Sequence, residues 1–340
     1  MTEAVVPPAV PLSLSDGPLL GLPLPEIWFG LLFFVLAVFL ALDGFDFGVG
    51  AIFALRSNPH EREQLIAAIG PFWDGNEVWL VVFGGALFAA FPSVYANLFS
   101  RHYLLMFAIL GALILRGLAP EMYEQRHDDR WQRWWGRAFV VGSLAAPFFL
   151  GMFTANWLLG ATTLVTLPGV LVGLTVVALT VVDGVAFLRL KTRGDLRNDL
   201  QSDGYRALAA YLVLVVLTLV GVYALAPGLR STMRSTLVLG LVLSTLVLAA
   251  GYVLATRADR YYVAFAAAAG LVFALVGVVA RLLYPSIDPA VGLTVDAAIV
   301  PTLSLNLMSI GAALLLPLVF SYFVVLYSAF SGPIEAGESY

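Results

Sequence analysis

A pair of carboxylic acids opens one of the apolar runs of this chain. Asp74 and Glu77 stand in the segment GPFWDGNEVWLVVFGGALFAAFP, which begins at Gly70, and Trp73 and Trp79 flank them. Residues three apart lie on the same face of a helix. An ionised carboxylate inside a bilayer costs about 2.5–3.5 kcal/mol unless it is paired, hydrated or protonated. We therefore expect Asp74 and Glu77 to handle protons, although an acid at this position could also simply start a helix.

Two further acids, Asp43 and Asp46, stand three residues apart in the apolar motif LDGFDFGVG. Acids within membrane helices commonly line functional sites, which makes both residues candidates for the same proton path. The alternative is a tight helix contact at Gly44 and Gly48, with Asp46 hydrogen-bonded to a neighbouring helix. The sequence leaves both interpretations open.

Several other residues could tune or support these acids. Arg116 stands in a later apolar run and is most simply the counter-ion of one of the acids. Asn76, Trp73 and Trp79 are interpreted as tuning or structural residues, because they share the segment that carries the acids. Trp73 could also line a cleft for a quinone or another cofactor.

The composition places these residues in a membrane. Hydrophobic residues make up 61% of the 340 residues, charged residues make up 12%, and the mean hydropathy is +0.93. These values lie far outside the range of soluble proteins, so we expect a polytopic membrane protein. The net charge of −4 is too small to imply a charged partner such as a nucleic acid.

Metal and haem ligands are scarce. The chain has no cysteine, which excludes disulfides and thiolate metal sites. Its three histidines, His60, His102 and His127, stand in or beside predicted loops, and we expect His60 and His102 to be solvated or interfacial. We therefore expect this chain to bind no metal and no haem of its own.

Nine apolar runs are long enough, at about 20 residues each, to cross a bilayer as helices. We predict an all-α fold with a single membrane domain over 26–330, a Pro-rich tail at 1–25 and a short tail at 331–340. The predicted spans are 26–50, 76–98, 102–119, 136–159, 164–188, 206–226, 235–256, 261–284 and 298–328.

Basic residues predict the orientation of these spans. Thirteen arginines and lysines follow the first, third, fifth and seventh runs, against four on the opposite side. Because basic loops stay in the cytoplasm, the N-terminal tail should lie outside and the C-terminal tail in the cytoplasm. Asp43, Asp46, Asp74, Glu77 and Arg116 would then lie in the cytoplasmic half of the membrane or at its edge. This clustering predicts an inward-facing polar pocket or a water path.

A weak internal repeat relates two parts of the chain. Asp43-Gly44 in the first run is matched by Asp183-Gly184 in the fifth, and the two runs share a direction. The match suggests two parallel four-helix halves followed by one extra helix. Ala186 replaces the second acid, so a pocket would belong to the first half. The predicted parts cover about 26–160, 161–284 and 298–328.

Longer motifs resemble a known family. LDGFDFGVG, GPFWDGNEVWLVVFGGALFAAFPSVY, Arg116-Gly117, LYPSIDP and SLNLM are together similar to subunit II of the cytochrome bd-type quinol oxidases, over about residues 26–330. The resemblance implies a nine-helix protein that pairs with a subunit I of similar fold in the cytoplasmic (inner) membrane of a prokaryote. In that family subunit I carries the b- and d-type haems and the quinol site. The complex reduces dioxygen to water with quinol electrons and cytoplasmic protons.

The resemblance also implies roles for this chain. Subunit II of the family carries no haem, some members hold a structural quinone there, and a small single-helix accessory subunit can join the complex. The family's proposed proton pathway starts at the acid of the WDGN motif, which is Asp74 here, and Trp73 and Asp46 match the pattern.

These observations together predict a mechanism. Asp74 would gather protons at the cytoplasmic face, and Glu77 and Asp46 would extend a hydrated path toward the subunit interface, while Arg116 pairs with Asp46 or Glu77. Two alternatives stay open. Parallel repeats with an acidic, inward-facing pocket also suit a proton-coupled secondary transporter. A purely scaffolding subunit would carry the same buried acids for assembly.

Overall fold

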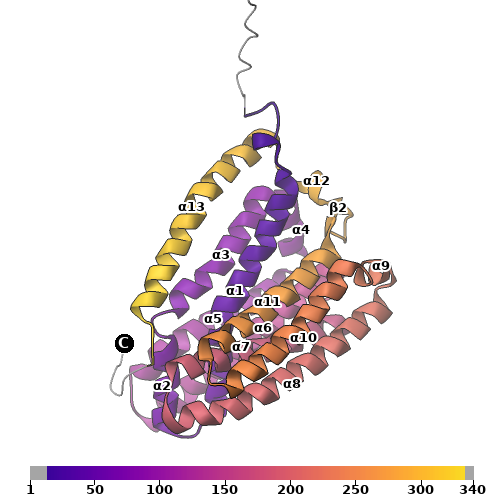
Figure 1. Ribbon diagram of the computed structural model, residues 1–340. Coiled ribbons are helices and arrows are strands. Elements are labelled where there is room, and N and C mark those ends of the chain that lie inside the picture. The colour runs from indigo at the N-terminus through magenta and orange to yellow at the C-terminus, as the bar shows by residue number, and fades with distance from the viewer. Residues whose placement is uncertain (1–13, 334–340) are drawn as a thin grey trace, which may run out of the picture.

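Long helices dominate the computed structural model, which describes residues 14–333 (Figure 1). Within that range eight helices are long and apolar enough to cross a membrane. The expectation of a helical, multi-pass membrane protein is therefore confirmed. The eight are α1 (Leu24–Ala54), α5 (Tyr103–Glu124), α6 (Asp129–Leu159), α7 (Leu167–Lys191), α8 (Gly194–Leu225), α10 (Thr236–Arg257), α11 (Tyr261–Leu283) and α13 (Thr302–Ala329).

Short elements join the long helices. A two-stranded antiparallel hairpin, which the all-helical expectation missed, connects α11 to α13. The predicted tails at 1–25 and 331–340 fall largely outside the described residues. Besides the 18-residue helix α3 (Trp73–Ala90), the remaining elements are η1 (Leu19–Gly21), α2 (Pro59–Ile69), α4 (Pro92–Arg101), η2 (Pro227–Leu229), α9 (Arg230–Met233), β1 (Ser286–Asp288), β2 (Leu293–Thr294) and α12 (Val295–Ala298).

The prediction of one continuous span over 76–98 is wrong. The helix ends at Ala90, Phe91 leaves the helical region with φ −131° and ψ 60°, and α4 begins at Pro92. Proline has no backbone N–H and disfavours a helical residue before it, so the chain turns there. The Ala90 carbonyl oxygen instead accepts a hydrogen bond of 3.0 Å from the Val300 amide.

Other helix boundaries differ from the predicted ones, because a helix can extend beyond the apolar segment that hydropathy marks. α6 begins at Asp129 rather than 136, and the Asp128 side chain caps it by accepting from the Trp131 amide. α8 begins at Gly194 rather than 206, so its first turns are polar. His102, expected to be solvated or interfacial, is 2% exposed at the turn between α4 and α5, so its side chain is not solvated.

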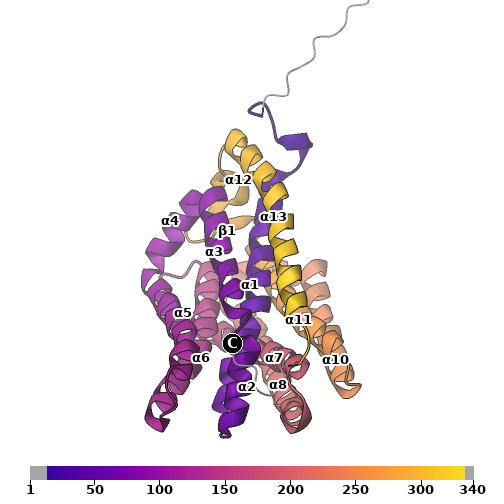
Figure 2. The same ribbon diagram turned by 90° about the vertical axis from the view of Figure 1, so that its left-hand side faces the viewer.

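Helix α1 lies at the centre of the bundle. It packs against α3, α6, α7 and α11. Of the residues in its most apolar stretch 72% are buried, against 6% in the corresponding stretch of α13. Figure 2 shows α13 along the outside of the bundle. Aromatic side chains make its contact with α3, where Trp79 meets Phe320 and Phe323 at centroid distances of 5.2 and 5.3 Å.

Small residues let α1 and α7 touch along their backbones. A Cβ added at Gly48 would collide with the Thr180 carbonyl oxygen and lie 2.8 Å from the Gly184 Cα. The interpretation of this motif as a close helix contact therefore holds at Gly48. The contact brings Asp43-Gly44 and Asp183-Gly184, the two dipeptides of the internal repeat, against one another.

We expect Gly48→Ala to destabilise the protein by about 1–3 kcal/mol or more, because the new methyl group meets backbone that cannot move aside. Gly240→Ala in α10 is the matched control, since nothing lies within 4 Å of that position. Thermal unfolding of the purified protein followed by tryptophan fluorescence measures both. Equal midpoints for the two variants would contradict the backbone contact at Gly48.

Candidate functional site

The centre of α1 carries two acids that no solvent reaches. Asp43 and Asp46 are each 0% exposed, and they lie about one helical turn apart on α1, which together with α7 is the most buried of the eight long helices. The rest of this stretch of α1 is apolar, so the surrounding residues give the two carboxyl groups little solvation. Their partners have to come from other helices.

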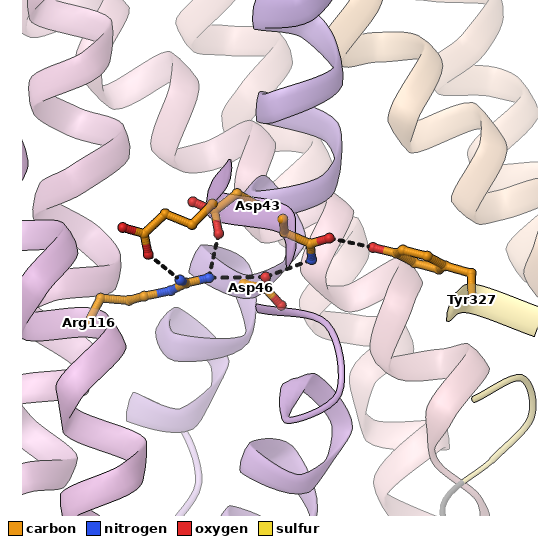
Figure 3. A network of polar contacts seen from close by, with 6 residues as sticks. Asp43, Asp46, Arg116 and Tyr327 are labelled. Carbon is orange, nitrogen blue, oxygen red and sulfur yellow. Dashed lines mark hydrogen bonds and ion pairs between the residues drawn. The ribbon is translucent and has the colours of Figure 1, made fainter. Parts of the chain in front are cut away.

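Arg116 of α5 supplies the only cation among the residues described here that pairs with these acids. Its Nη2 atom lies 2.6 Å from Asp43 Oδ1 and 3.0 Å from Asp46 Oδ2, and its Nη1 atom lies 3.3 Å from Glu77 Oε2 (Figure 3). The predicted partners were Asp46 or Glu77. The structure places both of them, and Asp43 as well, on the one guanidinium.

The start of α3 adds the next part of the network. The Asn76 amide donates a hydrogen bond of 2.9 Å to Asp46 Oδ2. The Tyr327 hydroxyl of α13 donates one of 2.7 Å to the side-chain oxygen Oδ1 of Asn76, which extends the network across the bundle (Figure 3). Four helices, α1, α3, α5 and α13, therefore meet at one buried polar network.

Exposure rises stepwise from the network to the surface. Arg116 is 1% exposed, the Glu77 side chain is 32% exposed, and Asp74 on the first turn of α3 is exposed. Asp74 and Glu77 are three residues apart on one helix, as the sequence predicted. The acids thus form a series that leads from the surface into the bundle.

The charges in the network do not balance. Asp43, Asp46 and Glu77 share one guanidinium, so at most one of the three carboxylates is neutralised by it. Asp43 Oδ2 and Asp46 Oδ1 have no hydrogen-bond partner within residues 14–333. Buried carboxylates without partners are costly, so the remaining acids must hold protons or bind water. A network in this condition can accept and release protons.

Aromatic rings and glycines hold the guanidinium in place. Arg116 lies over the rings of Phe47 and Trp73, 5.2 and 5.7 Å from their centroids. Gly117 makes room for Trp73, because a Cβ there would lie 2.9 Å from the indole. Gly142 of α6 likewise lies against the Arg116 backbone, where a Cβ would come within 2.6 Å of the amide nitrogen.

Trp79 lies apart from this network. It is 1% exposed and packs between the aromatic rings of α13, and its indole nitrogen has no hydrogen-bond partner among the described residues. Its contacts are those of a packing residue.

Asp183, in the other half of the chain, lies beside the network without bonding to it. It is 0% exposed on α7, and its Oδ2 atom lies 3.6 Å from the position that a Cβ of Gly44 would take. Neither of its carboxylate oxygens has a hydrogen-bond partner in the described part of the chain. The repeat-related acid therefore borders the acids of α1.

A largely apolar cavity of about 580 Å³ has Glu77 in its wall. Residues of six helices, α1, α3, α4, α5, α6 and α7, line it, and its wall includes Phe83, Met106, Thr154 and Trp157. Trp73, which we considered as the wall of a quinone cleft, is not among the lining residues. No group of three or more acids and histidines within 14–333 could hold a metal ion.

Sequence reasoning missed two members of the network. Tyr327 lies in a helix whose sequence reads as lipid-facing, and nothing in its surroundings signals a polar partner. Phe47, directly after Asp46, carries no sign that it would lie on a guanidinium. Both contacts depend on how separate helices pack, which local patterns do not specify.

Comparisons with known proteins identify the family of this chain. Residues 24–330 match the family model described as cytochrome bd terminal oxidase subunit II. Cytochrome bd ubiquinol oxidase subunit 2 of Bacillus subtilis (strain 168) is 32% identical over 88% of this chain and 95% of its own length. Cytochrome bd-I ubiquinol oxidase subunit 2 of Escherichia coli (strain K12) is 33% identical over 58% of this chain and 56% of its own length.

A solved structure shares the fold. One chain of the bd oxidase from Geobacillus thermodenitrificans superposes with a TM-score of 0.73 at 18% identity, covering 91% of this chain and 99% of that one. The family match spans all eight long helices as well as α3, the helix that begins with the WDGNEVW motif. This chain therefore belongs to the cytochrome bd terminal oxidase subunit II family.

Proposed function

We propose that this chain acts as subunit II of a quinol:dioxygen oxidoreductase and provides the complex with a path for proton uptake from the cytoplasm. The observation that carries the proposal is the buried network around Arg116, which reaches the surface through Glu77 and Asp74. Reduction of dioxygen to water consumes protons inside a low-dielectric site, and only acids or waters can deliver them.

The order of the acids supports a direction for the path. Asp74 would gather protons at the surface and pass them to Glu77, one helical turn further in. Arg116 would lower the cost of charge on Glu77, Asp43 or Asp46 in turn, because it contacts all three. Asp183 would serve as a further acceptor beside Gly44.

The arrangement of the helices supports nine crossings rather than eight. α3 has 18 residues, about 27 Å at 1.5 Å per residue, which is close to the thickness of the hydrocarbon core of a bilayer. The beginning of α13 is tied to the beginning of the chain, since the Leu19 amide donates a 2.8 Å hydrogen bond to Asn306. With the excess of arginine on the other side, the N-terminus would lie outside and the C-terminus in the cytoplasm.

The partner that this proposal requires is a haem-bearing subunit I in the same prokaryotic cytoplasmic membrane. It would carry the b- and d-type haems and the quinol site, and a small single-helix subunit could join the pair. Exposed apolar side chains on α3 and α13, including Val81, Phe88 and Leu318, offer a lipid- or subunit-facing surface.

The cavity at Glu77 suits a quinone as a structural ligand of this chain. Its apolar wall would hold the isoprenoid tail, and Glu77, Tyr95 and Thr154 are the polar residues that a ring carbonyl could meet. A bound quinone supplies two-electron redox chemistry. In the proposed role this chain's residues only hold the molecule and exclude water from the cavity.

We expect Asp74→Asn to slow oxygen consumption by roughly 10-fold or more, because the path loses its surface acid. Haem content should be unchanged, since Asp74 is exposed. Asp199→Asn, which removes an exposed acid on the same side of the bundle, is the matched control. If Asp74→Asn turns over as fast as this control, proton entry does not begin at Asp74.

We expect Arg116→Gln to cost about 3–5 kcal/mol, because it leaves buried acids without their cation. The yield of assembled complex and its haem-to-protein ratio measure this loss. Adding Asp43→Asn should restore part of the yield, since the two residues form the 2.6 Å pair. An Arg116→Gln complex of normal yield would contradict the ion-pair network.

Asp183→Asn separates the proton path from the scaffolding alternative. No described residue within range donates to this carboxylate, so the amide should change the unfolding midpoint little. A fall in oxygen consumption at normal haem content would place Asp183 on the path. Normal turnover would show that the acid serves packing alone.

A further inference from the structure

A second cavity, of about 790 Å³, lies where the end of α5 meets the beginning of α6. Figure 2 shows these two helix ends side by side at the end of the bundle that carries α2 and α8. Arginines and tryptophans make up most of the wall. The lining residues are Leu115, Arg126, Asp128, Arg130, Trp131, Trp134, Trp135, Arg137, Ala138 and Val141.

The chemistry of this wall changes in order along α6. Arg130, Trp134, Arg137 and Val141 follow at spacings of four, three and four residues, so they form one stripe on the helix. The stripe begins at the membrane surface with a cation and an indole, and it ends in aliphatic side chains about 15 Å deeper. Leu115 of α5 faces the same cavity beside its apolar end.

The two arginines of the stripe differ from Arg126 in their contacts. Arg126 Nε forms an ion pair of 3.2 Å with Asp128 Oδ2, and the guanidinium carbon lies 5.1 Å from the centroid of the Trp131 ring. In contrast, no ion pair or hydrogen bond within residues 14–333 involves the side chain of Arg130 or Arg137. Asp128 is the one acid in the wall, and its carboxylate already caps α6 and pairs with Arg126.

We propose that this cavity binds a phospholipid with a negatively charged headgroup. Arg130 and Arg137 bind its phosphate, the Trp134 indole lies at the level of the headgroup, and an acyl chain follows Val141 and Leu115. Guanidinium groups pair well with phosphate oxygens, and basic pockets on the cytoplasmic side of membrane proteins bind anionic headgroups. The inference rests on the orientation under the proposed function, which makes this end cytoplasmic.

Native mass spectrometry of the complex purified through this chain tests the site. The complex is delipidated and then titrated with phosphatidylglycerol or with phosphatidylcholine. Arg130→Gln/Arg137→Gln should retain phosphatidylglycerol roughly 30-fold more weakly, because each interfacial arginine contributes on the order of a fivefold gain. Arg257→Gln/Arg260→Gln, which removes two exposed arginines on the same side, should retain it normally. Phosphatidylcholine should bind weakly to every form.

Three results would overturn the proposal. Equal retention of phosphatidylglycerol by the two double variants would mean that the stripe is not the site. Equal retention of the two lipids by the unaltered complex would mean that the site does not select for the charge of the headgroup. Displacement of the lipid by inorganic phosphate at equal concentration would identify a site for the free anion. Oxygen consumption at saturating lipid should be the same in both double variants as in the unaltered complex. This control distinguishes a loss of lipid binding from a loss of proton uptake.

Discussion

One guanidinium inside the membrane, shared by three carboxyl groups, constrains most of this fold. Arg116 can reach Asp43, Asp46 and Glu77 only if α1, α3 and α5 meet at one depth. In hydrocarbon an unpaired charge costs several kcal/mol. Separating these helices would leave buried charges unpaired, and this free-energy cost holds the helices together. Gly117 and Gly142 supply the space that this meeting requires.

The network is poorly suited to stability alone. A cation paired with a single acid would have no net charge. Replacing such a buried ion pair by apolar residues often leaves the stability of a protein unchanged or raises it. Here two more acids share the cation, Asp183 lies close by without a hydrogen-bond donor among the described residues, and the series opens to the surface at Glu77. Excess acids with access to water are expected of a path that carries protons, and they favour this role over scaffolding.

Much of this arrangement could be predicted from the sequence. Apolar length located the eight long helices, because the cost of exposing backbone to lipid leaves few alternatives. The sequence also predicted that Asp74 and Glu77 share one face of a helix and that Arg116 pairs with a buried acid, and the structure shows the contacts of Arg116 with Glu77 and Asp46. The break at Phe91 was missed, since hydropathy continues unchanged through Pro92. Tyr327 and the burial of His102 were also missed, because both depend on which helices pack together.

In the proposed path for proton entry, Glu77 links the exposed Asp74 to the buried network around Arg116. A fully reduced complex mixed with dioxygen takes up protons, which a pH-sensitive dye follows during a single turnover. We expect Glu77→Gln to delay proton uptake by roughly 10-fold or more while the haem spectrum is unchanged. Uptake at the unaltered rate in Glu77→Gln would show that protons reach the active site by another route.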